Sequence, residues 1–126
     1  MLTDWFLVLA GGMLGAPTRY LTGVAVKSRV HSPFPFGTLT ANLAACLLLG
    51  FLSEAMLRGA LTDNEQLLLA TGFCGALSTW STFSYEQFTL ASTRRTALAA
   101  LYLAFTVVLG MGLSFAGAGI ARDIWN

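Results

Sequence analysis

The chain has 126 residues, of which 56% are hydrophobic and only 10% charged, and its formal net charge is +1. Soluble domains carry about 25% charged residues, and so short a chain cannot hide this much apolar surface from water. The composition therefore excludes a disordered chain, a basic nucleic-acid-binding face and a disulfide scaffold, and it indicates one domain in a lipid bilayer.

Long uncharged intervals separate the charged residues, and they predict four transmembrane helices. A helix needs about 20 mostly apolar residues to cross a bilayer. The intervals place the spans at roughly 4–26, 36–57, 66–92 and 96–121. Little of the chain is left for the connections, so we expect a single all-α transmembrane domain over residues 1–126. Its expected location is the inner (plasma) membrane, as a multi-pass protein.

The connections between the spans are short and carry local signals. Two prolines within residues 32–35 forbid a continuous helix between the first two spans. Thr62 or Asp63 is typical of a helix N-cap, because Glu65 or Gln66 follows in the first turn of the third span.

An even number of spans puts both termini on one side of the membrane. That side carries Arg58 and Arg122. The opposite side carries Lys27, Arg29, Arg94 and Arg95, with Arg19 as a fifth basic residue if it lies near that end. The excess favours a cytoplasmic position for the 1–2 and 3–4 loops.

No ionisable residue stands at the centre of a span. Arg19, Glu54 and Glu86 lie nearer the span ends. Buried carboxylates usually mark proton-coupled pathways, so their absence from the span centres argues against a proton-coupled carrier. The known catalytic motifs are absent too, and we expect the protein not to be an enzyme.

Asn42 is the first neutral polar residue at depth. Thr38 and Cys46 lie four residues to either side, so the three share one helix face. Two interpretations stay open. The amide could form an interhelical hydrogen bond, or its NH₂ group could donate a hydrogen bond to an anion.

The middle of the third span, residues 72–84, contains two glycines and five hydroxyl residues. Such a run forms a poor helix, and a break would free carbonyl oxygens that can hold a cation. After the break, Trp80 and Phe83 share one helix face, with Ser81 and Ser84 beside them. Aromatic residues at this spacing are also typical of ordinary packing.

Polar and small residues also follow a helical repeat in the fourth and first spans. Tyr102, Thr106, Gly110 and Ser114 recur every four residues and form one stripe. Gly110 could serve close helix packing instead. In the first span, Gly11 and Gly15 form a small-xxx-small pair, which predicts a helix contact within or between subunits.

These residues resemble the Fluc (CrcB-type) family of fluoride channels over nearly the whole chain. The resemblance rests on three motifs: Gly11-Gly-x-x-Gly-Ala-x-x-Arg19-Tyr20, Gly37-Thr-Leu-x-x-Asn42 and Gly72-Phe-Cys-Gly-x-Leu-Ser-Thr-Trp-Ser-Thr-Phe-Ser84. It implies an antiparallel, dual-topology dimer with two pores, through which fluoride leaves the cytoplasm passively.

The resemblance also implies roles for individual residues. Carbonyl groups of Gly75 and Ser78 would hold a structural sodium ion (Na⁺) at the dimer centre, and Gly11, Gly15 and Arg19 would lie at the dimer interface. The ion pathway would comprise Asn42, Trp80, Ser81, Thr82, Phe83, Ser84, Tyr102, Thr106, Gly110 and Ser114. Trp80 and Phe83 occupy the positions of the family's paired phenylalanines, whose ring edges are positive and can face an anion.

Two departures from the family pattern leave alternatives open. Trp80 replaces the first phenylalanine of the pair, and Gly110 stands where many members have serine. Together with the excess of basic residues in two loops, these departures suggest that the chain is one subunit of a heterodimer. Its partner would be a paralogue, and the chain itself would conduct poorly. A small proton-coupled exporter is a further alternative, although the first span lacks its carboxylate.

Overall fold

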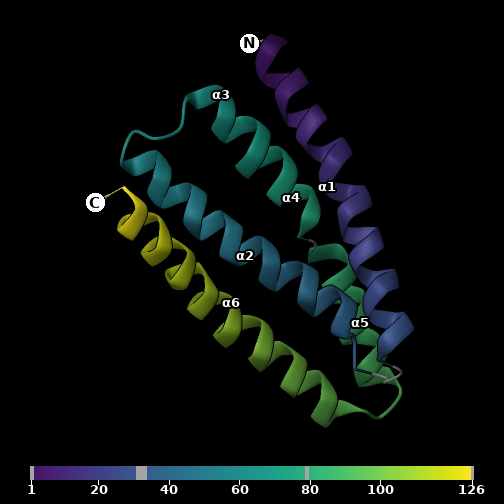
Figure 1. The fold of residues 1–126 in the computed structure, drawn as a ribbon. Coiled ribbons are helices and arrows are strands. Elements are labelled where there is room, and N and C mark those ends of the chain that lie inside the picture. The colour runs from purple at the N-terminus through teal and green to yellow at the C-terminus, as the bar shows by residue number, and fades with distance from the viewer. Residues whose placement is uncertain (1, 31–33, 79, 126) are drawn as a thin grey trace.

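The computed structural model describes residues 2–30, 34–78 and 80–125, which form four helical segments (Figure 1). The third segment comprises several consecutive elements. The elements are α1 (Leu2–Arg29), α2 (Phe36–Leu57), α3 (Asp63–Gln66), the π-helix η1 (Leu67–Cys74), α4 (Gly75–Leu77), α5 (Trp80–Ser92) and α6 (Thr96–Ile124). The predicted all-α class is confirmed.

The helix starts follow the local sequence signals. Pro35 immediately precedes α2, as expected of a residue that cannot continue the preceding helix. Thr62 caps α3 in a capping box. The Glu65 N–H donates to Thr62 Oγ1 over 3.2 Å, and the Thr62 N–H donates to Glu65 Oε1 over 3.2 Å. The predicted cap is therefore confirmed, with Thr62 as the capping residue.

The third segment is interrupted where the glycine- and hydroxyl-rich run predicts a break. α4 ends at Leu77, and Ser78 has extended backbone angles of φ −80° and ψ 158°. The next helix begins at Trp80, while Thr79 lies outside the described residues. The sequence patterns do not predict the π-helical turns of η1 just before the break. Such turns are rare and are frequent at functional sites.

Glycines let α6 lie directly against α2, the helix at the centre of the view in Figure 1. A Cβ atom on Gly50 would collide with the carbonyl group of Ser114, and one on Gly117 would collide with the carbonyl oxygen of Leu47. The two backbones therefore approach closely, as small residues allow in membrane helices.

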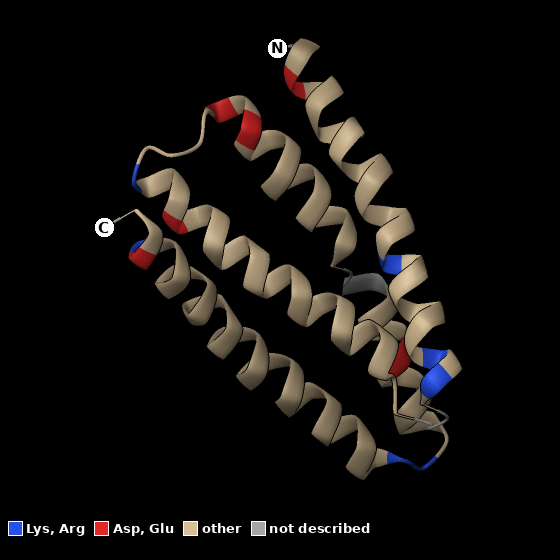
Figure 2. Cartoon of the chain, viewed as in Figure 1, with Lys and Arg blue, Asp and Glu red and all other residues tan. Residues whose placement is uncertain are grey.

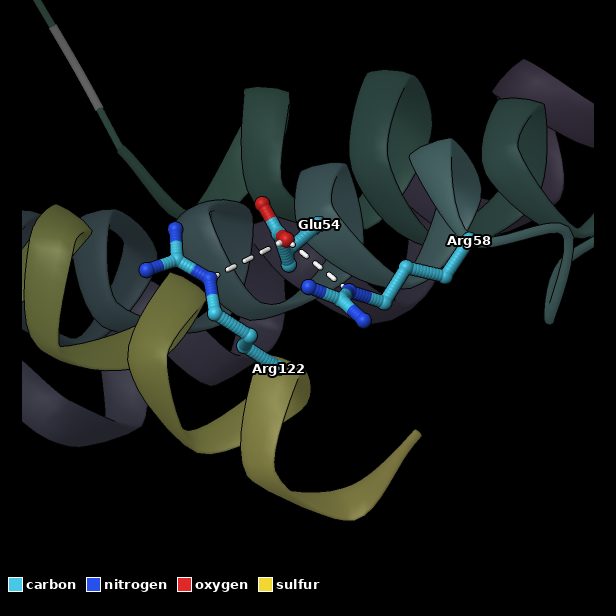
Figure 3. A network of polar contacts seen from close by, with 3 residues as sticks. All are labelled: Glu54, Arg58 and Arg122. Carbon is cyan, nitrogen blue, oxygen red and sulfur yellow. Dashed lines mark hydrogen bonds and ion pairs between the residues drawn. The ribbon is translucent and has the colours of Figure 1, made fainter. Parts of the chain in front are cut away.

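An ion-pair network joins the ends of the same two helices (Figure 3). Glu54 of α2 accepts hydrogen bonds at Oε1 from the Nε groups of Arg58, over 3.0 Å, and of Arg122, over 3.5 Å. Arg122 belongs to the last turn of α6. The shared carboxylate thereby connects α2, the residue that follows it and the C-terminal end of α6.

Two helices, α2 and α6, are long and apolar enough to cross a membrane. Most of the apolar stretch of α6 is exposed in a single subunit. Within the described ranges, α1 is long enough to cross a membrane, with 28 residues, but it is not apolar enough. The third segment is divided into elements that are each too short to cross.

Candidate functional site

An aromatic cluster joins α5 to α6. Phe83 of α5 is 5% exposed and Tyr102 of α6 is fully buried. Their ring centroids lie 4.9 Å apart with the ring planes at 61°, which is an edge-to-face arrangement. Phe34, which precedes α2, also contacts Tyr102 edge-to-face at 5.5 Å. Two residues of the predicted ion pathway are thus in direct contact within one chain.

The Tyr102 hydroxyl connects this cluster to a surface groove. It donates a hydrogen bond to Glu86 Oε1 over 3.3 Å. Glu86 lines a groove of about 470 Å³ between α1, the start of α2 and α5, together with the cations Arg19 and Lys27. Tyr102 does not line the groove itself, but its hydroxyl contacts Glu86, which does. The two cations outnumber the carboxylate, so the groove favours anions.

Thr106 lies one turn after Tyr102 in α6, and its hydroxyl group forms no hydrogen bond in the described part of the chain. Its Oγ1 atom is buried and has no hydrogen-bond partner among the described residues. The next members of the stripe face α2: a Cβ atom on Gly110 would lie 3.3 Å from Cys46 Sγ, and the Ser114 hydroxyl donates to the Cys46 carbonyl over 3.3 Å. Gly110 and Ser114 of the predicted stripe therefore face α2, and Thr106 of the same stripe provides an unpaired hydrogen-bond donor.

The other predicted pathway residues lie in two elements. Asn42 is buried within α2, at 8% exposure. Thr82 and Ser84 are exposed on α5, next to the buried Phe83. Trp80 and Ser81 belong to α5, but their side chains lie outside the described part of the structure. The structure thus brings Phe83 and Tyr102 together, and the role of every pathway residue stays a prediction.

The two residues predicted to hold sodium lie at opposite ends of α4: Gly75 begins the helix and Ser78 follows it. Gly75 is exposed, and a Cβ atom there would meet no other atom within 4 Å. Ser78 leaves the helical conformation, while its N–H and its hydroxyl both donate to the Cys74 carbonyl over 3.0 Å. Carbonyl oxygens beside an open surface are suitable ligands for a hard cation.

Two of the three residues expected at the dimer interface make contacts inside the subunit. Gly11 packs against the Leu68 carbonyl of η1, and Gly15 packs against the Phe73 carbonyl. Arg19 lines the groove with Glu86. The small-residue pair thus serves an intrachain helix contact, one of the two roles that its spacing predicts. Its place at a subunit interface stays a prediction.

Sequence reasoning did not identify two polar residues of α5 as part of the site. Glu86 binds Tyr102, and the Gln87 Nε2 atom is buried without a hydrogen-bond partner in the described residues. Gln87 follows Phe83 by four residues and therefore lies on the same helix face. This spacing is the sequence pattern that could have identified Gln87.

The fold and site define a small helical membrane protein whose interior carries neutral hydrogen-bond donors and aromatic edges. The family model described as "CrcB-like protein, Camphor Resistance (CrcB)" matches residues 6–118.

Relatives match over nearly the whole chain. A protein of Streptomyces avermitilis named "Fluoride-specific ion channel FluC 1" is 44% identical over 97% of this chain and 98% of its own length. A protein of the same name from Frankia casuarinae is 46% identical over 98% of this chain and 99% of its own length. The chain belongs to the Fluc (CrcB-type) family of fluoride channels, as its motifs predict, and this family is not one of enzymes.

Proposed function

We propose that this chain forms a fluoride-selective channel that exports fluoride from the cytoplasm by passive flow. The observation that carries the proposal is the buried, unpaired hydroxyl of Thr106, one turn from the contact between Phe83 and Tyr102. A buried polar group without a partner costs about 1–3 kcal/mol. A small anion on the pathway would accept its hydrogen bond and offset that cost.

The neighbouring groups are suited to an anion. Aromatic ring edges are positive, so the edges of Phe83 and Tyr102 can accompany fluoride through a region without a fixed charge. We propose that Asn42, Thr106 and three hydroxyl residues of α5 (Ser81, Thr82 and Ser84) donate hydrogen bonds along the same route. The names of the relatives state fluoride specificity, and this supports fluoride as the anion.

The proposed assembly is an antiparallel homodimer with two pores in the inner membrane, each chain crossing the lipid bilayer several times. The largely exposed apolar surface of α6 supports burial against lipid and a second subunit. We further propose that the carbonyl groups of Gly75 and Ser78 hold a structural sodium ion between the subunits. The exposure of Gly75 supports this role, because a partner could approach it closely.

A heterodimer with a paralogue is the second candidate, and the distribution of charge favours it. Acidic residues gather toward the end of the bundle with the termini, and basic residues toward the other end (Figure 2). Five of the seven basic residues belong to the latter end: Arg19, Lys27, Arg29, Arg94 and Arg95. Such a bias favours one orientation in the membrane, so an oppositely oriented partner would then come from another gene.

Fluoride efflux from liposomes that contain the purified protein alone tests both candidates. Rapid efflux of fluoride without chloride is the result expected of the homodimeric channel. Efflux that appears only after co-purification with a paralogue would establish the heterodimer instead. A rate that saturates and depends on a proton gradient would contradict a channel and identify a proton-coupled exporter.

A further inference from the structure

A second groove lies near the opposite end of α2 from the first. It has a volume of about 220 Å³ and is lined by Leu49, Leu52, Ser53, Gln66, Ala70 and Thr71. Thr38 lines the first groove and Ser53 lines the second, 15 residues later in the same helix. Fifteen residues of α-helix rise about 22 Å, whereas the hydrocarbon core of a bilayer is about 30 Å thick. The two grooves are therefore separated by most of a membrane's thickness.

The polar side chains of the second groove are unpaired. Hydroxyl groups in helices commonly donate to the carbonyl four residues earlier. Elsewhere in the described part of the chain, the residues that do so include Thr18, Thr22, Thr40, Ser78, Thr89 and Thr93. Within the described ranges, the side chains of Ser53, Gln66 and Thr71 have no hydrogen-bond partner. Thr71 lies in η1, whose wider π-helical turns differ from the α-helical pattern.

The second groove continues the face of α2 that carries Asn42. Residues at intervals of four, seven and eleven positions share one side of an α-helix, and Cys46, Leu49 and Ser53 follow Asn42 at those intervals. Ser53 lies about 16 Å from Asn42 along the axis. A passive pathway needs an opening to water at each end, and the first groove supplies only one.

Both carboxylates adjacent to the groove residues are bound to other groups. Glu54, next to Ser53, is paired with Arg58 and Arg122. Glu65, next to Gln66, accepts hydrogen bonds from the backbone and hydroxyl of Thr62. The free groups that line the groove are therefore neutral. Neutral donors can replace part of an ion's hydration shell without holding the ion as a fixed opposite charge would.

We infer that the groove of Ser53, Gln66 and Thr71 is the second mouth of the anion pathway. Two hydroxyls and an amide NH₂ group donate hydrogen bonds there to a small anion as it exchanges water for protein. The inference rests on the proposed channel function and adds three residues to the pathway, none of which belongs to the motifs that identify the family.

Fluoride efflux from liposomes tests the role of the donors. The Ser53→Ala/Thr71→Val double variant removes both hydroxyls, and we expect efflux about tenfold slower than wild type. The matched control is Thr40→Val/Thr89→Val, because both of these hydroxyls are exposed but bound to backbone carbonyls. The control should conduct at the wild-type rate. A wild-type rate in the double variant would overturn the inference while leaving the channel function intact.

Thiol labelling tests whether the groove contains water, independently of conduction. In a Cys46→Ala/Cys74→Ala background, a Ser53→Cys variant should react with a charged, membrane-impermeant thiol reagent. Val108→Cys, at an exposed apolar position of α6, should remain unreactive. An unreactive Ser53→Cys variant would overturn the inference even if the double variant were slow. Wild-type liposomes that release no fluoride would refute the channel function itself, and this inference with it.

Discussion

The ring of Phe83 meets the ring of Tyr102 edge-to-face, and the hydroxyl of the same tyrosine binds Glu86. One buried side chain therefore links an apolar part of the proposed pathway to the groove that carries Arg19 and Lys27. An anion that leaves this groove would pass from cationic side chains to ring edges and neutral donors.

Replacing Phe83 should slow fluoride flux without preventing assembly. Phe83→Ile keeps an apolar side chain in the core but removes the aromatic edge, and we expect efflux to fall by about tenfold. Phe88→Ile is the control, since Phe88 is exposed on the same helix. Efflux assays should be paired with size-exclusion chromatography. An unchanged rate in the Phe83 variant would remove this ring from the pathway.

Thr106 should show opposite effects on stability and on conduction. Thr106→Val removes a buried hydroxyl that has no partner among the described residues. The free energy of unfolding in detergent should therefore stay the same or rise, by up to about 1–3 kcal/mol. The same change should lower fluoride efflux, because a donor is lost. Thr106→Ser keeps the hydroxyl and should conduct. Loss of stability in the valine variant together with normal efflux would indicate a packing role instead.

The contact between α2 and α6 should be sensitive to one methyl group. Gly117→Ala places a Cβ atom against the Leu47 carbonyl, and we expect a loss of about 1–3 kcal/mol in stability. Gly112→Ala lies on the same helix with no atom within 4 Å of the added Cβ, so thermal unfolding should barely change. Equal melting temperatures for the two variants would contradict the close approach.

Sodium should stabilise the assembled protein. If the carbonyl groups of Gly75 and Ser78 bind the ion between subunits, exchange of sodium for potassium or N-methylglucamine should lower the melting temperature and promote dissociation. Readdition of sodium should restore the dimer, as measured by light scattering. Dimers with the same stability in all three cations would refute the sodium site.

The sequence predicts several helix limits, because local chemistry decides them. The expected span 36–57 coincides with α2, since Pro35 fixes its start. The break near Ser78 follows from glycines and hydroxyl residues that favour other conformations. Thr62 has its capping partner only three residues away, so the motif is visible in a single turn.

The remaining features depend on neighbours that are distant in the sequence. Tyr102 and Glu86 are separated by 16 residues, and their hydrogen bond requires α5 to fold back along α6. The spacing of Gly11 and Gly15 predicts a close contact but not its partner, which the structure identifies as η1. The unpaired hydroxyl of Thr106 is a property of the packed interior, so no local pattern reveals it.

The unequal distribution of charge between the two ends of the bundle has an electrical consequence (Figure 2). Two identical antiparallel chains are related by a twofold axis in the membrane plane, so each face of the dimer presents one acidic and one basic end. Such a channel would carry equal current at opposite voltages in symmetric solutions. Two different chains lack that axis, and their channel would rectify, so the shape of the current–voltage curve reports which assembly forms.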